Sequence, residues 1–154
     1  MLGVLWWGGF TVLGVWAQFF FPGIDFFAPG LILCFQENRG RLALWLAVAW
    51  ILILEGSGSL AFGYGLPWYA GLALLYAGGR WIFHAKNVLF MCILGLSLGA
   101  WHYLLTLGLA ELEDVLVPAG RLLREGAWQA VVFPVEWALL NRFYPERLRD
   151  APAL

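Results

Sequence analysis

Hydrophobic residues form long continuous runs along this chain, and the polar residues gather in short groups between them. Six runs can be distinguished, at residues 2–21, 24–35, 42–54, 66–83, 88–107 and 127–140. Because they are continuous rather than alternately apolar and polar, they favour helices over the strands of a barrel. At about 1.5 Å per residue, the first and fifth runs are long enough to cross a hydrocarbon core of about 30 Å.

The composition explains why so many apolar residues occur together. Hydrophobic residues make up 62% of the chain and charged residues only 12%, against about 45–50% and about 25% in soluble proteins. A domain of 154 residues cannot hide that much apolar surface from water, so lipid is the expected solvent. Backbone groups in lipid must be paired internally. We therefore predict an all-α fold, a polytopic transmembrane helix bundle that forms a single domain over residues 1–154.

The number and direction of the spans follow from run length and charge. Six spans are expected, but run 24–35 covers only about 18 Å as a helix and could be re-entrant, which would leave five. Seven of the nine Lys and Arg residues lie in the groups at 36–41 and 80–87 and in the polar tail, residues 141–154. Segments rich in Lys and Arg stay in the cytoplasm, so the tail should lie on the cytoplasmic side of a bacterial inner (plasma) membrane. If run 24–35 does not cross, the N-terminus lies outside, but the side of the tail and the charge bias are unchanged.

Two further segments need interpretation: the first apolar run and the polar residues 108–126. The first run has no Lys or Arg before Arg39 and no small-residue cleavage site after it, so we interpret it as a retained span rather than a signal peptide. Residues 108–126 are polar but carry leucines at helical spacing. Part of this segment is expected to lie along the membrane surface, either as a partner-binding face or as a solvated connector.

The chain shows no pattern typical of an enzyme. It lacks a glycine-rich phosphate loop, a nucleophile elbow and Cys/His metal spacing. Cys34 and Cys92 sit in apolar runs and are interpreted as small hydrophobic residues. The net charge of −1 gives no basic field for nucleic acid. We expect no catalytic activity, no cofactor and no metal.

Two sets of residues within the runs are candidates for special roles. Gly95 and Gly99 form a GxxxG pair, which lets helix backbones approach closely, either inside one chain or between two. Glu55, His102 and Glu136 are ionisable groups that are costly in a membrane. They either form one intramembrane polar cluster, or Glu55 simply ends its helix while Glu136 reaches toward the interface.

Several short motifs together resemble a known family. They are Ile24-Asp25-Phe26, Asn38-Arg39-Gly40-Arg41, Leu54-Glu55-Gly56-Ser57-Gly58-Ser59 with Leu60 and Gly63, and the last run from Val131 and Pro134 through Leu140-Asn141-Arg142. In this order they resemble the bacterial rod shape-determining protein MreD family, over roughly two thirds of the chain. The resemblance implies six spans and a non-catalytic scaffold of the cell-wall elongation machinery that supports cell shape. It also implies an MreC-type periplasmic partner and other membrane proteins of the elongation complex.

The same resemblance supplies an alternative function. MreD proteins share their architecture with the substrate-binding S components of energy-coupling-factor vitamin transporters. A vitamin-binding protein would need a pocket open to the outer face, where Glu55 and His102 could line it. S components typically dock their coupling subunit through an Ala-x-x-x-Ala face on the first span. The first run here offers Gly9, Gly14 and Ala17 instead, which favours the scaffold.

Overall fold

The computed structural model describes residues 1–56 and 63–149, and these form one all-helical domain with no strand among them. The described residues form seven helices: α1 (Leu2–Phe20), α2 (Ala28–Gln36), α3 (Gly40–Gly56), α4 (Gly65–Gly79), α5 (Val88–Leu112), α6 (Ala119–Phe143) and α7 (Glu146–Arg149). The all-α prediction is therefore confirmed. Residues 57–60 of the MreD-like motif and residues 150–154 of the tail lie outside the described residues.

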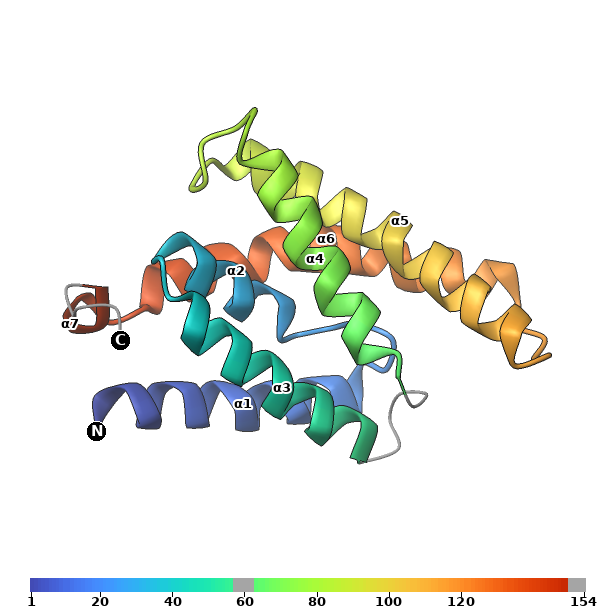
Figure 1. The fold of residues 1–154 in the computed structure, drawn as a ribbon, viewed down its shortest axis with the longest axis horizontal. Coiled ribbons are helices and arrows are strands. Elements are labelled where there is room, and N and C mark those ends of the chain that lie inside the picture. Colours follow the sequence, from blue (N-terminus) through green and yellow to red (C-terminus); the bar gives the residue numbers. More distant parts are fainter. Residues whose placement is uncertain (57–62, 150–154) are drawn as a thin grey trace.

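Successive helices run back and forth between two ends of the molecule (Figure 1). At one end, here called the terminal end, lie the N-terminus, α7 and the connections before α3 and α5. Contacts tie these parts together: Lys86 Nζ donates to Glu37 Oε1 at 2.9 Å, and the Arg39 guanidinium donates to the carbonyl of Leu148. At the opposite end, here called the hairpin end, residues 113–118 join α5 to α6.

Helix α2 is short and lies in the centre of the core. It begins at Ala28 with Pro29 in its first turn, and residues Ala28 to Cys34 are all buried. Before it, the carboxyl of Asp25 accepts the backbone N–H of Phe27 at 2.8 Å, which holds residues 24–27 out of the helix. The ring of Phe27 stacks on Trp50 of α3 at 4.6 Å. The continuous run predicted from residue 24 is thus helical only in its last two thirds.

The expected surface-lying segment at 108–126 takes a different form. Residues 108–112 extend α5 and residues 119–126 begin α6, so the polar segment is the tip of a helical hairpin. Ala110 and Leu122 continue the buried side of the two helices, so only residues 113–118 of the segment are not helical. Their position along a membrane surface stays a prediction. Each helix has 25 residues, about 37 Å.

The two long helices touch most closely where the GxxxG pair lies. A Cβ atom at Gly99 would sit 2.4 Å from the carbonyl oxygen of Gly126, and one at Gly126 would sit 2.7 Å from that of Gly99. A Cβ at Gly95 would lie 2.8 Å from the carbonyl oxygen of Ala130. That carbonyl has no helical partner, because Pro134 four residues later carries no N–H. The pair therefore packs inside one chain.

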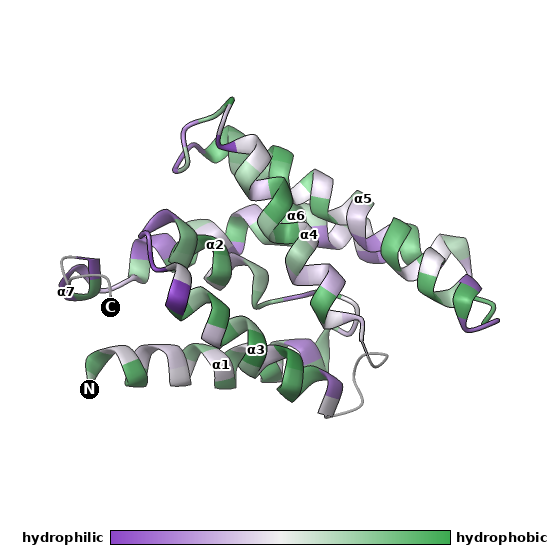
Figure 2. Ribbon diagram, in the orientation of Figure 1, coloured by the Kyte–Doolittle hydropathy of each residue, from purple (hydrophilic) through white to green (hydrophobic). Residues whose placement is uncertain are grey.

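Large apolar side chains cover much of the outside of the molecule. Figure 2 shows hydrophilic residues mainly in the connections, in α7 and at the α5–α6 tip. On α1, exposed side chains include Val4, Leu5, Leu13, Trp16 and Phe19. Within the described residues, α1 and α5 are long and apolar enough to cross a membrane, judged by length and composition. Extended apolar surface of this kind marks contact with lipid or with another protein.

Candidate functional site: a buried polar cluster at the hairpin end

Asp25 is the centre of a buried polar cluster. Its carboxyl accepts hydrogen bonds from Trp68 Nε1 at 2.5 Å and Gln18 Nε2 at 3.3 Å, besides the Phe27 N–H. Gln129 of α6 braces the backbone of the same residue. Its Oε1 accepts the Asp25 N–H at 2.7 Å, and its Nε2 donates to the Asp25 carbonyl at 3.3 Å. Asp25 thereby ties α1, α4 and α6 to the segment that leads into α2.

A second set of polar side chains continues the cluster. The hydroxyl of Tyr64 lies 2.8 Å from His102 Nδ1, and His102 Nε2 lies 3.3 Å from Glu125 Oε2. Arg121 Nε donates to Glu125 Oε1 at 2.7 Å. An ionised carboxylate can only accept, so the consistent assignment has His102 donating from Nε2 and accepting the Tyr64 hydroxyl at Nδ1. These contacts link α5 and α6 to the start of α4.

The electrostatics of this set support that assignment. Burial raises the pKa of Tyr64 above that of a free phenol, so its hydroxyl remains a donor. The hydrogen bond and charge of Glu125 raise the pKa of Arg121, which stays a cation. Tyr64, His102, Glu125 and Arg121 therefore form a continuous chain of paired groups from the interior to the surface.

The cavity beside the cluster is small. It measures about 90 Å³ and is lined by Asp25, Tyr64, Trp68, His102 and Gln129, among others. Pockets for organic ligands usually measure about 300–1,000 Å³. This cavity suits a few water molecules, which need several polar partners each. No group of three or more His, Cys, Asp or Glu side chains suited to a metal ion occurs within the described residues.

The structure gives the three predicted ionisable residues three different environments. His102 belongs to the cluster just described. Glu55 lies at the end of α3, where its Oε1 accepts the backbone N–H of Gly65, the first residue of α4, at 3.0 Å. Glu136 lines a separate hollow between α1 and α6. It follows Glu125, the partner of His102, by eleven residues of the same helix, about 16 Å. The three do not form the single cluster considered from the sequence.

Sequence reasoning missed the residues that surround His102. Asp25 and Gln129 are polar residues inside apolar runs, the same signal that singled out His102, but Asp25 was considered only as part of the motif Ile24-Asp25-Phe26. Glu125 was assigned to the surface segment. No family model, no curated protein and no solved structure matches the chain, so its function is inferred from its own sequence and geometry.

Proposed function

We propose that this protein is an integral membrane protein that crosses the bilayer six times, with both termini in the cytoplasm. The alternation of the helices between two ends supports this arrangement. So does the charge distribution, because seven of the nine Lys and Arg residues belong to the terminal end and positive segments remain cytoplasmic. The hairpin end then faces the outside.

The short second crossing is compatible with lipid. Helix α2 has nine residues, about 13 Å, and the non-helical residues 21–27 complete the crossing. Irregular backbone is tolerated at membrane depth where protein surrounds it and satisfies its polar groups. Here Gln129 and Asp25 supply those partners. Helices α3 and α4, with 17 and 15 residues, are shorter than a bilayer core, which local thinning of the bilayer accommodates.

Within the membrane, the protein acts as a non-catalytic scaffold of the cell-wall elongation machinery, as its resemblance to MreD implies. The small volume of the interior cavity, about 90 Å³, is the observation that favours the scaffold function over vitamin binding. An organic ligand needs several times that volume. The outer surfaces, in contrast, are extensive and apolar. The cavity beside His102 therefore leaves no room for a vitamin, whereas the outer surfaces suit contact with other proteins.

The α5–α6 tip is the surface best suited to an MreC-type periplasmic partner. Leu112, Val115 and Leu116 are exposed there, Leu116 completely. In the proposed orientation this tip projects on the outer side, where such a partner has its folded part. Exposed apolar residues on a rigid hairpin are typical of a protein-binding surface.

Depletion in the native organism tests the function. Cells should become round on depletion, excess vitamins should not restore their shape, and re-expression of the intact chain should. A Leu116→Asp variant should restore shape less well than Leu74→Asn, which alters an exposed leucine of α4 remote from the tip. Normal shape combined with a growth defect that one vitamin cures would reject the scaffold in favour of a transporter component.

A further inference from the structure

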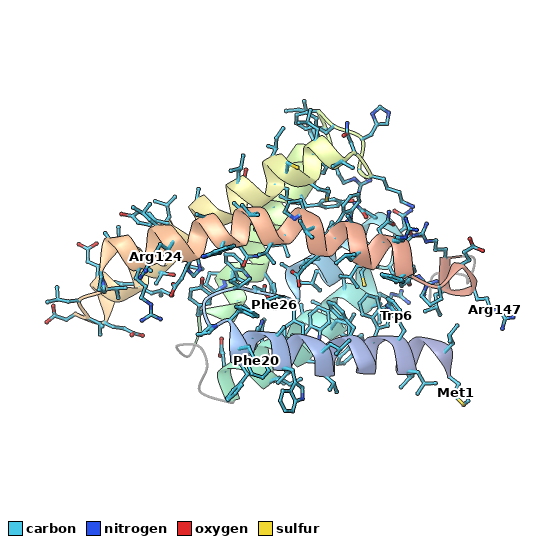
Figure 3. All side chains as sticks on the ribbon, turned by 180° about the vertical axis from the view of Figure 1, so that it is seen from behind. Met1, Trp6, Phe20, Phe26, Arg124 and Arg147 are labelled. Carbon is cyan, nitrogen blue, oxygen red and sulfur yellow. The ribbon has the colours of Figure 1, made fainter. Side chains whose placement is uncertain are left out.

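A long apolar groove runs between α1 and α6 on the outside of the molecule (Figure 3). Its terminal half has a volume of about 530 Å³ and its hairpin half about 470 Å³, and Phe26 lines both. Trp6 and Phe26 lie between the two helices in the figure. Other lining residues include Leu5, Gly9, Leu13, Leu139 and Phe143 in one half and Phe20, Trp128 and Val132 in the other.

The groove exists because α1 packs against the rest of the molecule through one edge only. The rings of Trp7 and Phe10 lie against Trp50 on that edge, at 6.3 and 5.7 Å between centroids. The rings of Trp6 and Tyr144 meet at 5.9 Å and close the terminal end of the groove. Along the groove wall, a Cβ atom at Gly9 would meet nothing within 4 Å. Open space therefore remains beside α1.

Two carboxylates line this otherwise apolar groove: Glu125 in the hairpin half, which pairs with His102 and Arg121, and Glu136 in the terminal half. The Oε2 atom of Glu136 is buried and has no hydrogen-bond partner among the described residues. The ion pairs found in the described part of the chain use Glu37 and Glu125 instead. A carboxyl group surrounded by apolar side chains and lipid is costly unless a donor or cation reaches it.

We propose that the α1–α6 groove seats the transmembrane helix of a partner protein, and that this helix presents a lysine or arginine to Glu136. The length of the groove suits a helix, because the wall from Leu5 to Phe20 of α1 extends about 22 Å. The small residues Gly9 and Ala17 on that wall allow close backbone approach. This inference rests on the proposed membrane insertion but not on a role in cell-wall synthesis.

The chemistry of Glu136 distinguishes the possible occupants. Lipid acyl chains carry no donor for a carboxylate. A second copy of α1 brings no Lys or Arg side chain, since the first Lys or Arg of the chain is Arg39. Glu136 lies seven residues before the end of α6 at Phe143, about 10 Å from the terminal end. A partner's lysine at that depth can reach the carboxylate and still approach the cytoplasmic interface.

Disulfide cross-linking to a model helix tests the proposal. The probe is a co-expressed Leu/Ala helix of about 20 residues, with one lysine about 10 Å from its cytoplasmic end and a cysteine one turn further in. In a C92S background, Leu13→Cys reports on the groove and Leu74→Cys is the control. Both leucines are similarly exposed, at 70% and 73%, but Leu74 does not line the groove.

The lysine helix should cross-link to Leu13→Cys about threefold or more above the same helix with leucine in place of lysine. E136Q should remove this preference, and E136K should transfer it to a helix with glutamate at that position. The Leu74→Cys control should show no preference. All variants should remain in the membrane after alkaline extraction.

Three results would overturn the inference. Equal yields with the lysine and leucine helices would remove the role of Glu136. Equal yields at positions 13 and 74 would mean that lipid fills the groove, and self-cross-linking through Leu13→Cys would make a second copy the occupant. Extraction of the intact chain at alkaline pH would instead reject the membrane proposal itself, so the two failures are distinguishable.

Discussion

Replacing Gly99 with alanine tests the closest contact in the fold. The new Cβ atom would lie 2.4 Å from the carbonyl oxygen of Gly126, a backbone atom that no side-chain rotation can move away. An ordinary van der Waals contact is about 3.4 Å or more, so α5 and α6 must separate locally by close to 1 Å. That separation also loosens the reciprocal contact of Gly126 with the Gly99 backbone, at 2.7 Å from an added Cβ.

The expected magnitude follows from overpacking. Forcing extra atoms into a tightly packed contact costs about 1–3 kcal/mol, while the higher helix propensity of alanine returns at most about 1 kcal/mol. Gly108 provides the matched control, because it lies on the same helix and a Cβ there meets nothing within 4 Å. Gly108→Ala gains the higher helix propensity of alanine without a steric clash of the new Cβ atom. Gly99→Ala should therefore have a free energy of unfolding about 1–3 kcal/mol below that of Gly108→Ala.

The assay is reversible unfolding of the purified protein in detergent micelles with increasing SDS, followed by tryptophan fluorescence and circular dichroism. Both variants should keep the helical content of the parent chain before unfolding. Equal stability of the two alanine variants would refute the close approach of α5 and α6. It would also remove the packing role assigned to Gly99.

The same assay checks three further changes. Gln36→Leu should lower the free energy of unfolding by about 1–3 kcal/mol, because Gln36 Oε1 accepts the buried Trp137 Nε1–H at 2.9 Å; an unchanged value would contradict that bond. Asp25→Ala should cost about 2–4 kcal/mol, since it removes the acceptor of the Phe27 N–H and of the buried Trp68 indole, and a loss below about 1 kcal/mol would show that Asp25 is not central. Lys86→Ala should cost under about 1 kcal/mol, because the lysine of its 2.9 Å pair with Glu37 is half exposed; a larger loss would mean that this pair holds the terminal end together.

The helices that carry no charge were the easiest to predict from the sequence. The first run was predicted to end at residue 21, and α1 ends at Phe20. The start of α6 was predicted eight residues too late, because its first turns carry Arg121 and Glu125 and were interpreted as a surface segment. The start of α2 depends on a hydrogen bond between Asp25 and the Phe27 N–H. Such a local bond is not visible in hydrophobic periodicity.

The candidate site was predictable only in part. His102 stood out because an ionisable side chain in an apolar run needs a partner. Its actual partner, Glu125, depends on how far α5 and α6 slide along each other, which run lengths do not reveal. The sequence also allowed Glu136 to join His102 in one cluster. The structure separates them because α5 and α6 extend beyond the predicted runs at the hairpin tip, which brings Glu125 rather than Glu136 to His102.

Accessibility of single cysteines tests the central claim, that the chain crosses a membrane six times, most directly. In a C92S background, cysteines would be introduced before Leu2, at His84 and at Leu116, all exposed positions, and treated with a membrane-impermeant maleimide. Leu116→Cys should react in intact spheroplasts, whereas His84→Cys and the N-terminal cysteine should react only after permeabilisation. Labelling of the N-terminal cysteine from outside would mean that residues 21–36 do not cross, and labelling of His84→Cys and Leu116→Cys from the same side would contradict the proposed topology altogether.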